Sequence, residues 1–238
     1  MQINAVVGLL DLFSPLDDDA QDLANMCESA RGAARRVDSK SAEAYLVAQK
    51  GYLLSFEFGR LAIERYMNVM TESTIGFSLE APHVAAESQK RLEELSTGYA
   101  EAFNTAITLA QESQSASGIA AVLISIGNAA GQRAMTLAHI GSNAAASHER
   151  DVCKRSLLAA KDLYAELGDE HGVANVQMNL ANHLRFLGET EAAMALVKAV
   201  IPVAEKFGDT DLRKKAGWLE ETLRTGIIPD YMAGERRQ

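Results

Sequence analysis

The sequence predicts an all-α protein. Alanine is abundant, aromatic residues make up only 6% of the 238 residues, and there are only four prolines. All-β folds rely on aromatic and β-branched residues and on frequent turns, so this composition disfavours them. No segment alternates apolar and polar residues between turn signals, whereas several long segments repeat apolar residues at helical spacing.

Four long helices are predicted in the first part of the chain, over about 15–36, 39–72, 83–110 and 119–140. The first begins at Ser14-Pro15, where serine can cap a helix and proline suits the first helical position. An interruption of the second helix near Gly59 is left open. The segment 71–82 is rich in small and polar residues and is the predicted loop between the second and third helices.

The second half of the chain repeats at an offset of forty residues. Leu167-Gly168-Asp169 recurs as Phe207-Gly208-Asp209. The clearest copy covers about 170–209, as two helices separated by Leu187-Gly188, and a preceding copy covers about 130–169. The segment from Asp211 to Arg224 is predicted to form one more helix, which caps the stack.

Small residues recur within these copies. Gly141 and Cys153 in one copy match Ala181 and Ala193 in the next, and the members of each pair are twelve positions apart. This pattern resembles the tetratricopeptide repeat in its forty-residue form, over about residues 120–225. The resemblance implies antiparallel helical hairpins stacked as a right-handed superhelix, with small side chains where the paired helices approach closely.

Three regions are expected on this basis. Residues 1–115 form an N-terminal helical region, either degenerate repeats or a bundle. Residues 116–225 form the repeats and their capping helix, and residues 226–238 form a tail that ends in the polar segment 234–238.

Composition and charge exclude several partners. The chain has 32 acidic against 23 Lys and Arg residues, and its net charge of −9 disfavours a nucleic-acid-binding protein. The two cysteines, Cys27 and Cys153, are too few and too far apart for a disulfide framework. The sequence has neither the basic start of a signal peptide nor an apolar run long enough to cross a bilayer. We therefore expect a cytoplasmic protein that binds neither nucleic acid nor membranes.

One acidic motif suggests an enzyme as an alternative. Asp18, Asp19 and Asp22 spell D-D-x-x-D, which resembles the magnesium-binding motif of all-α isoprenoid-processing enzymes. The segment 143–151 resembles their second metal motif, with aspartate in place of glutamate. The three aspartates follow a predicted helix start, where acidic side chains complement the helix dipole. Capping is the favoured interpretation, and a small magnesium-dependent all-α enzyme is the alternative.

Other chemical motifs are missing from the sequence. The five histidines have no metal-binding spacing. Neither a nucleophile elbow, nor a phosphate-binding loop, nor a dinucleotide fingerprint occurs. We therefore expect no catalytic residues, no metal site and no cofactor.

Three asparagines indicate a binding surface. Asn175, Asn179 and Asn182 follow helical spacing on one face of the first helix of the clearest repeat, with Arg185 one turn beyond. In proteins similar to this one, first helices line the concave groove, and asparagines there bind the backbone of an extended peptide. At the forty-residue offset, the neighbouring copy offers His139 and Ser142 for the same surface. The alternative is a solvated polar face without a partner.

The function expected from these features is a non-catalytic scaffold that binds a protein or peptide. It would be a regulatory or sensing part of a larger signalling protein. The acidic net charge favours a basic partner. Self-association through the helical faces is a second possibility within this class.

Overall fold

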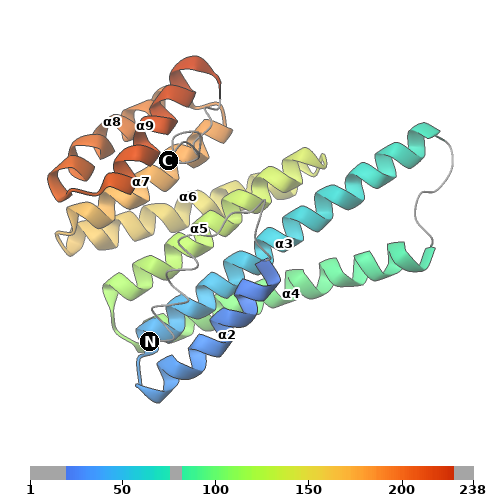
Figure 1. The fold of residues 1–238 in the computed structure, drawn as a ribbon, viewed down its shortest axis with the longest axis horizontal. Helices are drawn as coiled ribbons and strands as arrows, with labels where there is room; N and C mark the ends of the chain where they lie inside the picture. Colours follow the sequence, from blue (N-terminus) through green and yellow to red (C-terminus); the bar gives the residue numbers. More distant parts are fainter. Residues whose placement is uncertain (1–19, 76–81, 228–238) are drawn as a thin grey trace, which may run out of the picture. The chain divides into compact units, whose positions relative to one another are not determined.

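The computed structural model describes residues 20–75 and 82–227, and within these ranges it contains eight α-helices and no strands. The helices are α2 (Ala20–Arg36), α3 (Lys40–Ile75), α4 (Pro82–Glu112), α5 (Ala116–His139), α6 (Asn143–Glu166), α7 (Glu170–Phe186), α8 (Thr190–Phe207) and α9 (Thr210–Thr225) (Figure 1). The predicted all-α class is confirmed. The predicted helix start at Ser14-Pro15 lies outside the described residues.

The chain divides into two compact units after Ser156, within α6. Residues 116–156 therefore pack with the N-terminal part of the chain, although the predicted repeat region begins at residue 116. Compact units are defined by contacts, whereas repeats are defined by sequence, so the two boundaries need not coincide. The repeat boundary at residue 116 stays a prediction. No helix among the described residues is long and apolar enough to span a membrane.

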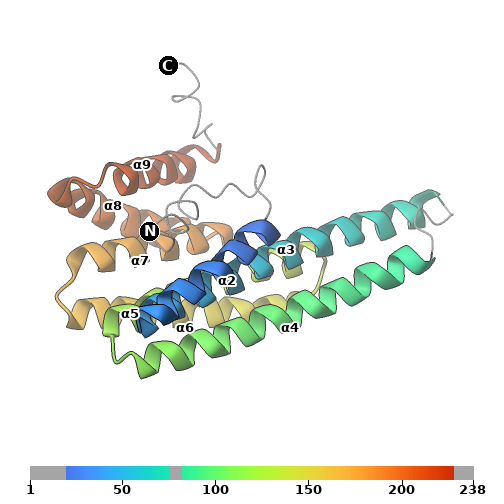
Figure 2. The ribbon, with the colours of Figure 1, turned by 60° about the horizontal axis from the view of Figure 1, so that its bottom comes forward.

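The first unit is built on a long antiparallel hairpin of α3 and α4, which run side by side in Figure 2. Lys40 at the start of α3 pairs with Glu112 at the end of α4, and Arg65 donates to Gln89 nearer the turn. Helices α2 and α5 both pack against α3. Because α3 is continuous from Lys40 to Ile75, it is not interrupted near Gly59.

The lack of a side chain at Gly59 serves the packing of α5 on α3. A Cβ atom at Gly59 would lie 2.8 Å from Thr136 Oγ1 of α5. Gly51, two turns earlier, meets α4 in the same way, since its Cβ would lie 2.9 Å from the ring of Phe103. These glycines allow close crossings between helices that otherwise continue without a break.

A buried charged residue joins four helices of the first unit. Arg133 of α5 is only 6% exposed, and its Nη2 donates to Glu149 Oε2 of α6 at 2.7 Å. Its Nη1 donates to Ser55 Oγ of α3 at 3.3 Å, and its guanidinium lies 4.4 Å from the ring centroid of Tyr99 in α4. A buried arginine without its carboxylate would cost several kcal/mol, so this contact strongly favours one arrangement of these helices.

The second unit contains the end of α6 and the helices α7, α8 and α9. Its core is formed by small and branched apolar side chains from the last three helices: Ala174, Ala181, Val197, Val200, Ala204, Leu212, Ala216 and Leu219.

The repeated Gly-Asp signature has a structural role at both of its sites. Asp169 accepts from the backbone N–H of Gly172, and Asp209 accepts from that of Leu212, each at 2.8 Å. Both aspartates therefore cap the helix that follows them.

The repeat register predicted for the first copy is wrong. Gly141 does not lie at a helix crossing; it is exposed in the turn after α5, with φ of +80°. Its counterpart is Gly188, which occupies the turn after α7 with φ of +75° and lies 47 positions later. The buried pair in the earlier copy is Ala134 and Ala146, which are twelve positions apart, as are Ala181 and Ala193.

Helix α6 contains an insertion that explains the two offsets. It has 24 residues, whereas α8 has 18. Ala146 and Ala193 near the two helix starts are 47 positions apart, whereas the buried Leu157 and Val197 further along are 40 apart. The difference of seven residues is about two helical turns, so the same face of the helix stays buried on both sides of the insertion.

Replacing Gly51 with alanine is expected to lower the free energy of unfolding by about 1–3 kcal/mol, because the new methyl group would overlap Phe103 and Ala102. Urea unfolding followed by circular dichroism measures this change. Gly32→Ala in α2 is the matched control, since the nearest atom to its new Cβ is the end of Arg36 at 3.6 Å. There the higher helix propensity of alanine should stabilise the protein by about 0.5–1 kcal/mol. Stabilisation by both substitutions would contradict the close crossing at Gly51.

Candidate functional site

The three predicted asparagines lie together on one face of α7. Asn175, Asn179 and Asn182 are each partly exposed, whereas Leu180 and Leu184 of the same helix are buried. The helix therefore separates an apolar side, which packs in the core, from an amide side that reaches solvent.

The asparagine amides differ in their hydrogen bonding. The Nδ2 of Asn175 donates to the carbonyl oxygen of His171 at 3.1 Å, one turn earlier. In the part of the chain that the structure describes, the amides of Asn179 and Asn182 have no hydrogen-bond partner. Each of these two amides can both donate and accept, which is the combination needed to pair with a peptide unit.

One end of this face carries a hydrogen-bonded pair that sequence reasoning missed. His171 Nε2 lies 2.7 Å from Asp209 Oδ2, and the His171 ring lies 5.4 Å from the ring of Phe207. An ionised carboxylate oxygen only accepts, so Nε2 carries the hydrogen in this contact. The pKa of Asp209 is lowered by the backbone N–H of Leu212 and then by His171. The pair therefore ties the start of α7 to the start of α9.

Arg185 occupies the other end of the helix. Its guanidinium lies 4.1 Å from the ring of Phe186 and 5.3 Å from the ring of Trp218 in α9. Burial lowers its pKa, and among the described residues its Nε has no hydrogen-bond partner. Aromatic faces attract a guanidinium, so these rings hold Arg185 in place. The sequence pattern did not reveal this stacking because Trp218 is remote from Arg185 in the chain.

His139 and Ser142 belong to the first unit, whereas the asparagines belong to the second. His139 is the last residue of α5, and its ring lies 6.1 Å from that of Tyr66. Ser142 is in the following turn, where its carbonyl accepts from the N–H of Ala146. Their membership of the asparagine surface stays a prediction.

The corrected register identifies other counterparts for the asparagines. At the offset of 47, Asn175 and Asn179 of α7 match Asn128 and Gln132 of α5, and both of these residues are partly exposed. The two helices thus carry amides at the same two positions. The turn glycines Gly141 and Gly188 are the sequence signal that could have shown this match.

The aspartate motif is only partly within the described residues. Asp22 is exposed in the first turn of α2, whereas Asp18 and Asp19 lie outside. Across residues 20–75 and 82–227, no group of three or more His, Cys, Asp or Glu side chains could hold a metal ion. The magnesium-dependent alternative stays an untested prediction.

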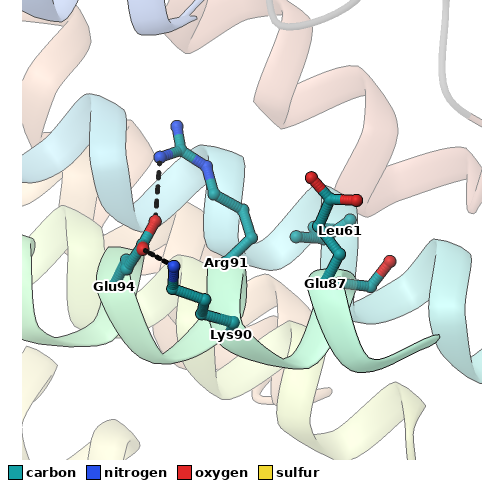
Figure 3. A pocket seen from close by; sticks show the side chains of 6 residues that line it. Leu61, Glu87, Lys90, Arg91 and Glu94 are labelled. Atoms are coloured by element: carbon teal, nitrogen blue, oxygen red, sulfur yellow. Dashed lines mark ion pairs between the residues drawn. The ribbon is translucent and has the colours of Figure 1, made fainter. Parts of the chain in front are cut away.

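Two open pockets are lined by residues other than the three asparagines. One, of about 420 Å³, is lined by Leu61 of α3 and by residues of α4 (Figure 3). The other, of about 330 Å³, lies beside the turn between α6 and α7 and is lined in part by Val173 and Gln177. These two side chains are on the opposite side of α7 from the asparagines by helical spacing. Gln177 therefore carries an amide on α7 that lies outside the proposed surface.

Comparison with models of known protein families, with curated proteins and with solved structures finds no match for this chain.

Replacing Asp209 with asparagine tests the contribution of the Asp209 carboxylate, which contacts His171 and Leu212. Asparagine keeps the shape of the side chain and can still accept from Leu212, but it lacks the charge. Because the pKa of Asp209 is lower in the folded chain than its usual 3.8, the ionised carboxylate stabilises the folded state above the unfolded pKa. That stabilisation is lost as pH falls through the folded pKa.

The difference in free energy of unfolding between the wild type and Asp209→Asn should therefore be largest above about pH 5 and decrease progressively as the pH is lowered toward about 2. Urea unfolding at a series of pH values measures it. Asp211→Asn removes an exposed charge from the same helix and serves as the control. A difference for Asp209→Asn that stays constant down to pH 2 would show that charge is not the cause.

Proposed function

We propose that this chain is a non-catalytic binding module that holds an extended segment of a partner protein along α7. The observation that carries the proposal is the pair of partly exposed amides at Asn179 and Asn182, which have no hydrogen-bond partner among the described residues. The proposal includes a tetratricopeptide-like stack of hairpins and a role as the regulatory or sensing part of a larger signalling protein.

The chemistry of the face favours the backbone of the partner as the group that is bound. An amide side chain can donate to the C=O and accept from the N–H of one residue of the partner, because these two groups point to the same side of an extended strand. Asn179 and Asn182 are three residues apart, which is about 4.5 Å along the helix axis and lies between the rise of one residue (about 3.3 Å) and of two residues (about 6.6 Å) of an extended strand. Side chains of the partner then point away from the amides, which explains how such a face can accept several sequences.

Charge supplies a second preference. The net charge of −9 attracts a basic partner at long range. Arg185 lies against the rings of Phe186 and Trp218 at the end of the face, where its guanidinium can donate hydrogen bonds to a carboxylate of the partner. A basic segment with one acidic residue or a free carboxyl end fits both features.

The double substitution Asn179→Ala and Asn182→Ala tests the proposal. Peptides selected against the immobilised wild-type protein from a random display library are synthesised with a fluorescent label, and their Kd is measured by anisotropy. Loss of two amide contacts should weaken binding about tenfold or more, with the melting temperature unchanged within about 2 °C.

Gln177→Ala is the matched control, since it removes an amide from the opposite side of α7. It should leave the Kd unchanged. N-methylation of the bound peptide units should weaken binding more than alanine substitution of the peptide side chains. Equal Kd values for the wild type and the double variant would rule out the amide face as the binding surface.

A further inference from the structure

The pocket of about 330 Å³ lies within the second unit, between the end of α6, the first half of α7 and the end of α8. Its lining residues are Ala165, Gly168, Asp169, Glu170, Val173, Gln177 and Val203. Two valines and an alanine thus form an apolar wall, and two carboxylates and an amide form the polar part. Ligand pockets span about 300–1,000 Å³, so this one suits a single long side chain.

The charge of the pocket lining has one sign. The lining carries the carboxylates of Asp169 and Glu170, and no Lys, Arg or His is among its described residues. Lys206 of α8, which lies outside the lining, pairs with Oε2 of Glu170. Asp169 forms no ion pair with any described residue. The pocket therefore stays negative when the pair of Glu170 and Lys206 is counted as neutral, and it favours a cation.

The carboxylate of Asp169 is held in position by the protein itself. Its Oδ1 accepts from the backbone N–H of Gly172 at 2.8 Å, and its own N–H donates to the carbonyl oxygen of Tyr164 at 2.9 Å. The ring of Tyr164 packs so closely on Gly172 that a Cβ atom there would lie 2.5 Å from it. The turn between α6 and α7 is thus fixed, and Asp169 does not need to be ordered when a ligand binds.

The polar groups of the pocket retain capacity to accept hydrogen bonds. Within the described part of the chain, Oδ2 of Asp169, Oε1 of Glu170 and the amide of Gln177 have no hydrogen-bond partner. An arginine side chain can bury its methylene groups on an apolar wall while its charged head stays among polar groups. Its guanidinium has five donors, whereas the ammonium of lysine has three, so several acceptors around one pocket favour arginine.

Exposed apolar side chains beside the pocket favour a polypeptide as the source of this cation. Leu167, in the turn that contributes Gly168 to the lining, is 52% exposed. Phe207, one helical turn after Val203, is 51% exposed. A small free cation would leave both side chains in water, whereas the residues that flank an arginine in a peptide can cover them.

We propose that this pocket binds an arginine side chain of a partner protein, with the methylene groups against Val173 and Val203 and the guanidinium toward Asp169. The negative lining and the net charge of −9 both favour a basic partner. Val173 and Gln177 are on the opposite side of α7 from the asparagines by helical spacing. The pocket is therefore a second binding site, and it does not depend on the proposed function of the asparagine face.

A capped peptide, Leu-Gly-Arg-Gly-Leu, tests the preference for the charge. Alternate residues of an extended strand point to the same side, so both leucines accompany the arginine. The matched probe carries citrulline, which replaces the guanidinium with an uncharged urea of similar shape. Titrations of the ¹⁵N-labelled full-length chain, followed by NMR, should give a Kd at least about fivefold lower for the arginine peptide. Equal Kd values for the two peptides would overturn the proposal.

Asp169→Asn keeps a side chain that can cap α7 but removes the charge. It should weaken binding of the arginine peptide about three- to tenfold and leave the citrulline peptide unchanged. Asp162→Asn, at an exposed position of α6 outside the lining, is the control and should change neither Kd. An unchanged Kd for Asp169→Asn, or equal weakening by both substitutions, would contradict the contact with Asp169.

Filling the pocket tests its location. Ala165 is exposed, so Ala165→Leu is tolerated by the fold and should weaken binding at least about tenfold, whereas Ala159→Leu at another exposed position of α6 should not. The double substitution of Asn179 and Asn182 by alanine should also leave the Kd unchanged. Weaker binding by this double variant would place the peptide on the asparagine face and overturn the proposal.

The free cation n-butylguanidinium identifies the source of the ligand. It has the charged head and the aliphatic part of arginine but cannot cover Leu167 and Phe207, so its Kd should be at least about threefold higher than that of the peptide. Equal or tighter binding of n-butylguanidinium would assign the pocket to a small free cation and overturn the assignment to a partner protein.

Discussion

Close approach between helices is the constraint on which this structure depends. Alanines that are fully buried line the contacts in both units: Ala24, Ala34, Ala44, Ala48, Ala106, Ala174, Ala181, Ala193, Ala204 and Ala216. Small side chains let two helix axes come nearer than leucine or phenylalanine would allow. At Gly51 and Gly59 even a methyl group would not fit without movement of the neighbour. The abundance of alanine is therefore a consequence of the packing geometry.

This way of packing also affects how the fold is stabilised. A buried alanine removes much less apolar surface from water than a buried leucine, so each contact contributes little free energy. Long helices compensate by repeating the contact many times, and α3 does so over 36 residues. The buried pair of Arg133 and Glu149 adds a contact that only one arrangement of its neighbours can satisfy. Repeated small contacts supply cohesion, whereas the charged pair supplies specificity.

Much of the fold was predictable from the sequence because its signals are local. The helix α5, the turn at Gly188 and the end of α8 at Gly208 all follow from spacing, caps and glycine. The register of the earlier repeat was not predictable at a fixed offset. The insertion in α6 is about two turns long, so it changes the offset without changing which face is apolar. Positional similarity therefore placed Gly141 at a helix crossing, whereas its positive φ shows that it forms a turn.

The asparagine face of the candidate site was also predictable from local sequence signals, whereas the contacts at its two ends were not. Helical spacing alone puts Asn175, Asn179 and Asn182 on one face, because they are close in sequence. The contacts of Arg185 with Trp218 and of His171 with Asp209 join residues that are more than thirty positions apart, and no periodic signal marks them. These contacts limit how the two ends of α7 can move. A helix that packs against its neighbours through Ala174 and Ala181 needs only a narrow apolar stripe. The asparagine side of α7 is therefore not needed for packing. Close packing by small residues is thus also the physical reason that a polar face is available on a helix of the core.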